Sequence, residues 1–371
     1  MAKIVLLSQA PLPTTQIGSW PKLYDYFLEN NRGIIDYIIC PEVDTSFHKG
    51  VNYLCLKKLP YSRLIGYLTG YRKLAYLKRL EALLVCEDKL ILKIIDNTGL
   101  LFEVQKYLVQ KKLRDRVKIM FFMHGYSYFY DPKKTEAFYS AIDHMVYLSE
   151  TSYRFELNRT HSITSKVSIL PNGIDSSKFY PIGQTLKEEI KGDLALKGNF
   201  IFLWCANQRP KKGLHIILDA WKKSSLYKDI NYELLIIGLD KTYKDENINF
   251  MGRIENYKLP QYYQISNFYL FTTLCHEGFP LSLTEALACG SKCLVSDIDP
   301  LPEIFSKFGN VSFVKNPNIV GSWIIALENT KASSVFFKPI NYELIQKELS
   351  IESWSSRLIQ IIDSESDVFN T

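Results

Sequence analysis

Two glutamates, Glu277 and Glu285, stand eight positions apart around a Gly-Phe-Pro turn in the segment "EGFPLSLTE". The β-branched and aromatic run "NFYLFTTLC" directly before them predicts a strand. Pro280 suits the first turn of a helix, and Gly290 fits the position after the end of that helix. Glu277 is therefore expected at the carboxyl end of a strand, the edge at which open α/β sheets bind ligands.

The first turn of this predicted helix is suited to a phosphate, because its backbone N–H groups have no partners inside the helix and its dipole is positive there. Gly278 lets the backbone approach a ligand closely. Glu285, one turn into the helix, would then accept hydrogen bonds from ribose hydroxyls, and Glu277 from a second polyol. The alternative is that both glutamates only stabilise a helix N-terminus, worth about 0.3–1 kcal/mol each.

Length and composition exclude several classes of protein. The 371 residues favour two domains, and 47% hydrophobic with 23% charged residues argue against a disordered chain or a polytopic membrane protein. A net charge of +6 fits anionic partners but falls short of a nucleic-acid binder, so we expect no nucleic acid as a partner. Seven scattered cysteines, an odd number, favour reduced thiols in a cytoplasmic protein. The apolar run at the N-terminus is too short for a secretory signal.

Short apolar runs bounded by turn residues predict two series of parallel strands with helices between them. They extend from "KIVLLS" to "VSILPNG" in the first half and from "FIFLWCA" to "KCLVSD" in the second. The predicted fold class is α/β, with two Rossmann-like domains that face a cleft. Gly, Pro, Ser and charge accumulate at 171–200, so we place the domains at 1–178 and 179–354. A C-terminal helix at about 355–371 is expected to pack back on the first domain.

Several segments together resemble the retaining GT-B-fold glycosyltransferases of family 4, and "EGFPLSLTE" resembles the E-x7-E motif of that family. The likeness covers nearly the whole chain and is strongest from 168 to 305. The other segments that carry it are "IGSWPKLYDYFL", "FFMHG", "PNGIDSSKFYP", "RPKKGLHIILDAW" and "INFMGRIENYKLPQYYQISNFYLF". The resemblance implies the GT-B fold, with an acceptor-binding first domain and a nucleotide-sugar-binding second domain.

By this resemblance, Lys212 neutralises the leaving diphosphate of a nucleotide-sugar donor, and Arg209 assists it. The family usually carries an arginine where this chain has Asn207, so either Arg209 or Asn207 replaces it at the phosphate. Gly18, in the loop after the first strand, would let backbone amides reach the distal phosphate. The alternatives are a solvated surface lysine and a plain turn glycine.

His124, at the end of a predicted strand, resembles the histidine that contacts the donor sugar, although a lone histidine is more often structural. The resemblance implies that Glu277 binds the hydroxyls of the donor sugar and that Glu285 binds the ribose. Arg253 falls where the family backbone holds the nucleobase. The backbone that would line sugar and phosphate belongs to Gly278, Phe279, Pro280, Leu281 and Ser282. The chain departs from the family at two places near the sugar pocket. Leu274 stands where the family often has serine, and Asp299-Pro300 lies in the region where it often has paired glycines. Both differences bear on the choice of donor.

The reaction implied is transfer of a sugar from a UDP- or GDP-sugar to a glycan or lipid-linked glycan, with retention at the anomeric carbon. It needs no metal and no cofactor beyond the nucleotide-sugar co-substrate. Same-face attack is favoured over double displacement, because no carboxylate is identified for the far face of the sugar. The family often serves bacterial cell-surface polysaccharide or lipopolysaccharide synthesis. Two rivals stay open: a GT-B nucleotide-sugar epimerase and a catalytically silent nucleotide-sugar-binding subunit.

Residues 57–79 contain seven Lys or Arg and no acid, interleaved with Tyr, Leu and Ile. Such a segment suits an anionic membrane surface and favours peripheral attachment to the cytoplasmic face of the cell membrane. The alternative is a solvated helix that packs its Leu and Tyr stripe on the first sheet. Aromatic residues after the histidine could stack on acceptor sugars: Tyr126, Tyr128, Phe129 and Tyr130.

Overall fold

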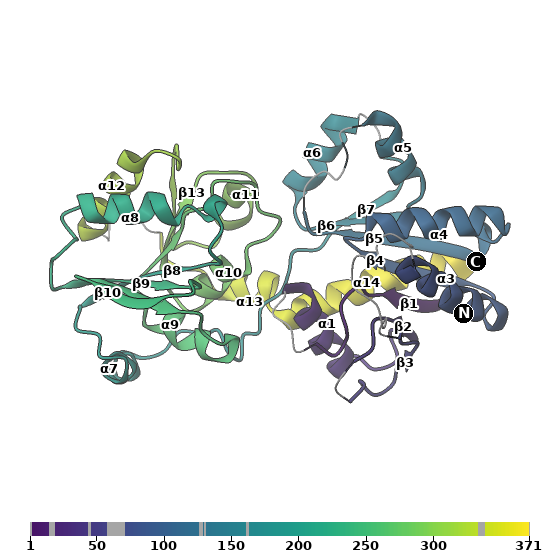
Figure 1. The fold of residues 1–371 in the computed structure, drawn as a ribbon, viewed down its shortest axis with the longest axis horizontal. Helices are drawn as coiled ribbons and strands as arrows, with labels where there is room; N and C mark the ends of the chain where they lie inside the picture. The colour runs from purple at the N-terminus through teal and green to yellow at the C-terminus, as the bar shows by residue number, and fades with distance from the viewer. Residues whose placement is uncertain are drawn as a thin grey trace. The chain divides into compact units, whose positions relative to one another are not determined.

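The computed structural model describes residues 2–14, 19–43, 46–57, 71–125, 129, 131–160, 163–332 and 338–370. The chain forms two compact units, one of residues 1–172 and 354–371 and the other of residues 173–353 (Figure 1). The first division lies six residues before the boundary expected from the sequence, at 172/173 against 178/179. Each unit contains one seven-stranded sheet covered by helices.

The first unit is built on a parallel sheet in the order β3-β2-β1-β4-β5-β6-β7. Its core forms because β4 and β5 are almost wholly apolar and buried, as expected for parallel strands covered on both faces. The strands are β1 Lys3–Leu7, β2 Tyr37–Ile39, β3 Asn52–Tyr53, β4 Leu90–Ile95, β5 Val117–Met123, β6 His144–Tyr147 and β7 Lys166–Ile169. The helices are α1 Ser19–Asn30, α3 Tyr71–Cys86, α4 Thr98–Gln110, α5 Pro132–Ser140, α6 Glu150–Thr160 and the C-terminal α14.

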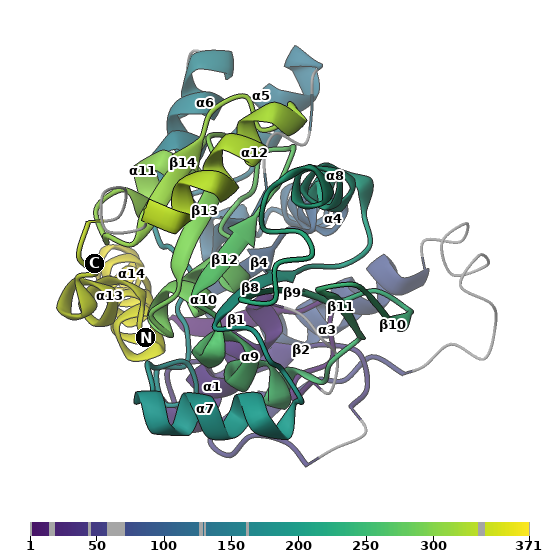
Figure 2. The same cartoon turned by 90° about the vertical axis from the view of Figure 1, so that its left-hand side faces the viewer.

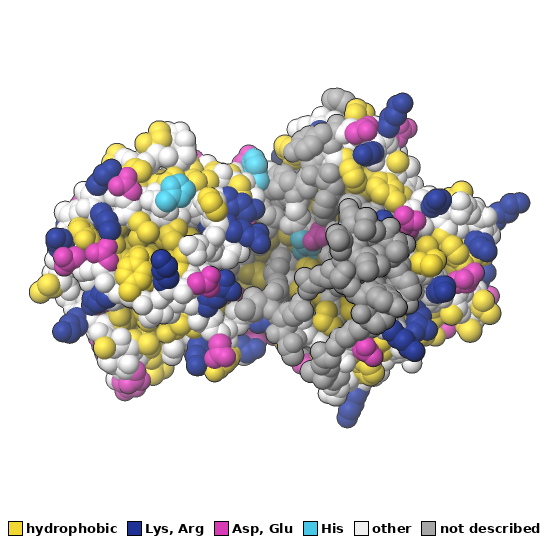
Figure 3. Space-filling model, in the orientation of Figure 1, with side chains coloured by type: hydrophobic (Ala, Val, Ile, Leu, Met, Phe, Trp, Pro, Cys, Tyr) yellow, Lys and Arg dark blue, Asp and Glu magenta, His cyan; other side chains and the backbone are white. Residues whose placement is uncertain are grey.

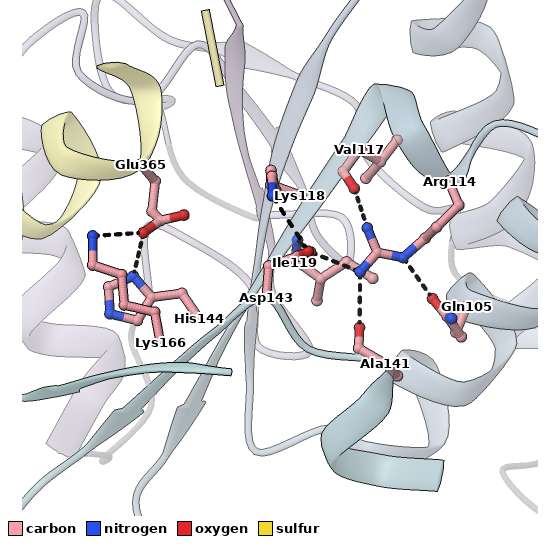
Figure 4. Close-up of polar contacts among 10 residues, drawn as sticks. All are labelled: Gln105, Arg114, Val117, Lys118, Ile119, Ala141, Asp143, His144, Lys166 and Glu365. Carbon is pink, nitrogen blue, oxygen red and sulfur yellow. Dashed lines mark hydrogen bonds and ion pairs between the residues drawn. The ribbon is translucent and has the colours of Figure 1, made fainter. Parts of the chain in front are cut away.

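The C-terminal helix α14 runs over Ile351–Asn370 and is longer at its start than the predicted 355–371. From residue 354 onward it belongs to the first unit. The Trp354 ring lies edge-on to the Tyr24 ring of α1, with 5.5 Å between the centroids. Near its other end, Glu365 Oε1 lies 2.9 Å from both His144 Nδ1 and Lys166 Nζ (Figure 4). The helix is thus held to α1 by an aromatic contact and to β6 and β7 by a charge cluster in which His144 and Glu365 are buried.

A second polar cluster of the first unit, around Asp143, joins β5 to the turn before β6 (Figure 4). Asp143 Oδ2 accepts a hydrogen bond from Arg114 Nη2 at 2.7 Å and another from the Ile119 backbone at 2.7 Å. Lys118 Nζ lies 3.6 Å from the other carboxylate oxygen. These contacts join β5 and β6 near their amino ends, away from the carboxyl ends at which His124 was predicted.

The second unit has the order β10-β11-β9-β8-β12-β13-β14, with only β10 antiparallel to its neighbour. Figure 2 shows α8 and α12 on one face of this sheet and α9 and α10 on the other. The strands are β8 Phe200–Cys205, β9 Tyr232–Ile237, β10 Thr242–Asp245, β11 Ile248–Gly252, β12 Phe268–Phe271, β13 Lys292–Ser296 and β14 Val311–Val314. The helices are α7 Gln184–Asp193, α8 Leu214–Lys223, α9 Leu259–Ile265, α10 Leu281–Ala288, α11 Leu301–Phe305, α12 Val320–Asn329 and α13 Tyr342–Leu349.

Three strands were not predicted from the sequence, β3, β10 and β14, and all three lie at sheet edges. One of them, β10, also departs from the expected parallel arrangement. β10 is a mostly exposed, polar strand that pairs antiparallel with β11, so it lacks the apolar run of a buried strand. β3 has only two residues, and β14 is mainly half-buried. Edge strands bury one side at most, which weakens the hydrophobic pattern that identifies the central ones.

The surface and the helices add two observations. On the face shown in Figure 3, acidic and basic side chains of the described residues are interspersed over both units. Within the described part of the chain, no helix is both long and apolar enough to cross a bilayer.

Candidate functional site

The candidate site lies at the carboxyl ends of β8 and β12, which are neighbours in the second sheet. The strand order reverses here, because β9 and β11 lie on one side of β8, while β12, β13 and β14 lie on the other. Such a reversal at the carboxyl ends of the strands is the usual place for a ligand in open α/β sheets. Both loops carry residues predicted to bind the donor.

Backbone and side-chain hydrogen bonds join these two loops. Thr272 Oγ1 donates to the carbonyl oxygen of Lys212 at 2.7 Å and accepts from Trp204 Nε1 at 2.9 Å. The backbone N–H of Leu274 donates to the carbonyl oxygen of Lys211 at 2.8 Å. The turn that carries Lys212 is thus fixed to the end of β12.

Gly213 is required where this turn passes into α8. Its φ is +71°, and a Cβ at this position would lie 2.0 Å from the carbonyl oxygen of Thr272. A side chain there would meet both an unfavourable backbone conformation and rigid backbone. The glycine lets Lys212 approach β12, which agrees with the Lys-Gly pairing in the sequence.

Lys212 and Glu277 form an ion pair, with 2.6 Å between Nζ and Oε1. Both side chains are largely buried, with 19% and 17% of their surface exposed. Thr273 Oγ1 donates to the same carboxylate oxygen at 2.8 Å. Hydrogen bonds between ionised groups are stronger than neutral ones, so the charged ends of these two side chains are held in place. The structure thus brings together the predicted phosphate ligand and the predicted sugar ligand.

The helix α10 begins at Leu281, directly after the Gly-Phe-Pro turn. Pro280 was expected in the first turn of this helix. It occupies the N-cap position instead, one residue before the first turn. Pro280 provides no side-chain cap, and the first-turn N–H groups of Leu281 and Ser282 have no helical partners. Gly290, at φ +89°, follows the C-cap residue Cys289, which confirms its predicted place after the helix.

Glu285 lies one turn into α10 and is half-buried. Burial raises the pKa of the Cys205 thiol to about 12, and the negative charge of Glu285 adds to the rise. The same charge adds to the raised pKa of Tyr263 and Tyr269, for which burial is the main cause. Glu285 is therefore near the ends of β8 and β12, on the side of α9.

The remaining predicted residues of this unit lie along the same sheet edge but are exposed. Asn207 and Arg209 follow β8, and their backbones are joined by a 2.8 Å hydrogen bond from Arg209 N to Asn207 O. Arg253 follows β11 and forms an exposed ion pair with Asp240 at 2.5 Å. The side chains of these three residues are not part of the Lys212–Glu277 cluster.

Residues 187–331 match the family model described as glycosyl transferases group 1. The matched region contains the whole edge just described, from Asn207 to Glu285. The assignment to family 4 and the reading of Glu277 and Glu285 as its E-x7-E motif stay predictions.

Two Escherichia coli proteins are similar to parts of the chain. One is described as UDP-Gal:alpha-D-GlcNAc-diphosphoundecaprenol alpha-1,3-galactosyltransferase; it is 29% identical over 167 residues, 41% of this chain and 39% of that protein. The other, O-antigen chain mannosyltransferase B, is 23% identical over 142 residues, 35% of this chain and 36% of that protein. The matches thus span less than half the length of these relatives.

The fold is shared with solved glycosyltransferase structures. Sucrose-phosphate synthase from Thermosynechococcus elongatus superposes with a TM-score of 0.75 at 14% identity, covering 99% of this chain and 100% of that one. Two parallel-dominant sheets with alternating helices are the GT-B architecture, so the predicted fold class is confirmed. At this level of identity the likeness concerns the fold alone.

In the first unit, His124 follows β5, as predicted. Asp96, after the neighbouring β4, accepts hydrogen bonds from the His124 backbone N–H at 2.8 Å and lies 3.1 Å from its Nδ1. Asp96 itself has a φ of +49°. The sequence analysis did not single out Asp96, although it ends the predicted strand "LILKIID". Strand pairing brings it to His124, and a search for acidic residues at neighbouring strand ends would have found it.

Some predictions fall outside the described residues: those on Gly18, Tyr126, Tyr128, Tyr130 and residues 58–70 of the basic segment. Of the described remainder, residues 71–79 belong to α3, which buries Tyr76 and Leu80 in the core of the first unit. Arg79 of the same helix donates to the carbonyl oxygen of Cys55. Residues 71–79 therefore pack on the first sheet, as the alternative reading of this segment expected.

Proposed function

We propose that this protein is a retaining glycosyltransferase that moves a sugar from a nucleoside-diphosphate sugar to a glycan or lipid-linked glycan acceptor. The observation that carries the proposal is the Lys212–Glu277 ion pair at the strand-order reversal of a sheet that matches glycosyl transferases group 1. A cation for a diphosphate and a carboxylate for sugar hydroxyls stand together at the edge where such sheets bind ligands.

Charge compensation is the main task of this site in the proposed reaction. When the bond from the anomeric carbon to the diphosphate breaks, negative charge develops on the departing oxygen. Lys212 and the first-turn N–H groups of α10 would stabilise that charge. Arg209 or Asn207 would add a donor from the exposed loop after β8. Glu277 would accept from the donor sugar and Glu285 from the ribose.

Retention would follow from attack on the same face as the departing diphosphate. In that step the acceptor oxygen bonds to the anomeric carbon, the bond to the diphosphate breaks, and the acceptor proton passes to the departing phosphate. His124 would contact the donor sugar, as the resemblance implies. We propose that Lys212 takes the place of a divalent metal.

The names of the relatives suggest the substrates. One is described as acting on UDP-Gal and a diphosphoundecaprenol-linked sugar, and the other as an O-antigen mannosyltransferase. We accordingly propose a UDP- or GDP-sugar donor and a role in bacterial cell-surface polysaccharide or lipopolysaccharide synthesis. No further cofactor is part of the proposal.

A cytoplasmic location with peripheral attachment to the membrane is proposed through the basic segment 57–79. Flotation with liposomes that contain an anionic lipid tests this proposal directly. Binding that falls as salt rises would support it, and absence of binding at low salt would contradict it.

The second candidate is a catalytically silent subunit that binds nucleotide sugar. Asn207 favours it, because a neutral side chain stands where the resembling family usually has an arginine. Arg209 is exposed and lies outside the Lys212–Glu277 cluster. Transfer of sugar from a donor to an acceptor would exclude this candidate.

Thermal unfolding with UDP, GDP, ADP and TDP tests the donor site. A ligand at a hundred times its dissociation constant adds about 2.7 kcal/mol to the free energy of unfolding. We expect one nucleotide to raise the melting temperature of the wild type and to have little effect on Lys212→Ala. If none of the four stabilises the wild type, the proposed donor site is wrong.

A further inference from the structure

The described contacts of the Glu277 carboxylate are all on one of its oxygens. Oε1 accepts from Lys212 Nζ at 2.6 Å and from Thr273 Oγ1 at 2.8 Å, and Cys275 Sγ lies 4.0 Å from it. Among the residues that the structure describes, none donates a hydrogen bond to Oε2. The carboxylate is therefore anchored on one side and has a second oxygen available to accept from a ligand hydroxyl.

Lys212, one of the two residues that hold the Glu277 carboxylate, is also the proposed ligand of the diphosphate. In the proposed function, Lys212 binds the diphosphate of the donor, yet its ammonium is paired with Glu277. A diphosphate carries more negative charge than a carboxylate and would compete for the same ammonium. Once Lys212 turns to the phosphate, Thr273 is the anchor that remains on Oε1.

Thr273 is well placed to hold the carboxylate alone. It is the second residue after β12, only 2% of its surface is exposed, and a β-branched side chain has restricted rotation about χ1. Its hydroxyl has one proton and lies near two oxygen acceptors, Glu277 Oε1 at 2.8 Å and the Cys275 carbonyl oxygen at 3.3 Å, and 3.6 Å from Cys275 Sγ. The shorter bond to the charged group is the stronger one, so the Thr273 hydroxyl donates its hydrogen bond to Glu277.

We propose that Thr273 is a positioning residue: its hydroxyl keeps Glu277 turned toward the donor sugar while the diphosphate engages Lys212. The inference rests on the proposed function and adds a division of labour to it. Neighbouring hydroxyls at the end of β12 hold the two halves of the site, Thr272 the turn of Lys212 and Thr273 the carboxylate of Glu277. Recognition of the sugar then depends on Thr273, and recognition of the diphosphate does not.

The test compares dissociation constants measured by calorimetry for UDP and UDP-galactose, and for GDP and GDP-mannose. Thr273→Val keeps the shape of the side chain and removes the hydroxyl. We expect it to weaken binding of the nucleotide sugar about tenfold or more, the usual worth of a hydrogen bond to a charged group. Binding of the corresponding nucleoside diphosphate should stay within about twofold of the wild type, since Lys212 is intact.

Two further variants make the result specific. Thr273→Ser retains the hydroxyl and should restore nucleotide-sugar binding. Thr330→Val is a matched control, because Thr330 is also buried and donates its hydroxyl to a backbone carbonyl, that of Leu327, away from the site. It should leave both dissociation constants unchanged.

The outcomes separate this inference from the proposed function. If nucleotide binds the wild type but not Lys212→Ala, and Thr273→Val binds the nucleotide sugar as the wild type does, the inference alone fails. If Thr273→Val loses nucleoside diphosphate and nucleotide sugar alike, Thr273 has only a structural role and the inference fails. If no nucleotide or nucleotide sugar binds the wild type, the proposed function fails and the inference falls with it.

Discussion

The two units place different chemistry at the carboxyl ends of their central strands. In the first, Asp96 after β4 orients His124 after β5 through a backbone and a ring nitrogen. In the second, Lys212 after β8 pairs with Glu277 after β12. A carboxylate beside an imidazole can orient the ring or exchange a proton with it. A lysine–glutamate pair instead offers a positive charge for a phosphate and a carboxylate for sugar hydroxyls. In the proposed function, the compensation of phosphate charge therefore belongs to the second unit.

Removing the cation of the second unit should have the largest effect. Lys212→Ala is expected to lower the rate of sugar transfer by about 10²- to 10³-fold, the range found when a group that stabilises developing negative charge is lost. The neighbouring Lys211, which is exposed, supplies the control. Initial rates with the preferred nucleotide sugar would show Lys211→Ala close to the wild type. Equal losses in both variants would mean that general basicity, not the paired lysine, serves the phosphate.

Acid should affect the first unit through a carboxylate that holds α14. Burial opposes ionisation of Glu365, but hydrogen bonds from His144 and Lys166 outweigh it and lower its pKa to about 2. Because the folded-state pKa is depressed, this stabilisation is full above the unfolded-state pKa of about 4.3 and is lost as the pH falls toward 2. The lowered pKa of Glu365 corresponds to about 3 kcal/mol of stability near neutral pH.

Glu365→Gln tests that sign. The variant should be less stable than the wild type by about 3 kcal/mol at pH 7 in urea unfolding, and the difference should shrink steadily below about pH 4. A difference that stays constant down to pH 2 would show that packing, not charge, accounts for the loss. Glu352→Gln, on the exposed part of the same helix, is the control.

The orientation of His124 should matter less than the charge of Lys212. Asp96→Asn keeps an oxygen for the backbone N–H of His124 but changes its partner at Nδ1. Loss of a hydrogen bond to a charged group corresponds to a decrease of about tenfold in transfer rate. Binding of the nucleoside diphosphate, measured by calorimetry, should be unchanged. Weaker diphosphate binding in this variant would erase the distinction drawn between the two units.

The smallest effect is expected at Arg253. Its side chain is 73% exposed and pairs with an equally exposed Asp240, an arrangement worth about 0.2–1 kcal/mol at most. Arg253→Ala should change nucleotide binding by no more than a few-fold, since the backbone of this loop is the part expected to hold the base. A loss as large as that of Lys212→Ala would show that the side chain reads the nucleotide directly.

Much of the second-unit site could be predicted from the sequence, because its residues follow apolar strands and lie next to turn and helix signals. Glu277 stands beside Gly278 and Pro280, so local pattern alone places it at a sheet edge, whereas Lys212, beside Gly213, was singled out through the family resemblance. Their mutual contact could not be predicted from local pattern, because it depends on β8 and β12 becoming neighbours across some sixty residues.

The residues that the sequence analysis missed act through that pairing. Thr272 and Thr273 look like ordinary β-branched strand residues, and their hydrogen bonds to Lys212 and Glu277 exist only in the folded sheet. Asp96 was missed for the same reason in the first unit. Strands with a buried apolar run were found, whereas the polar edge strand β10 was not. The hydrophobic pattern thus predicts the central strands and helices but not the polar contacts between residues far apart in the sequence.

The central claim, that Lys212 binds the donor diphosphate and gives up Glu277 to do so, is tested most directly by a crystal structure with the stabilising nucleoside diphosphate bound. The account predicts a phosphate oxygen within hydrogen-bond distance of Lys212 Nζ and of the first turn of α10, with Glu277 still bonded to Thr273. A diphosphate bound elsewhere, or one bound with the Lys212–Glu277 ion pair unchanged at 2.6 Å, would contradict it.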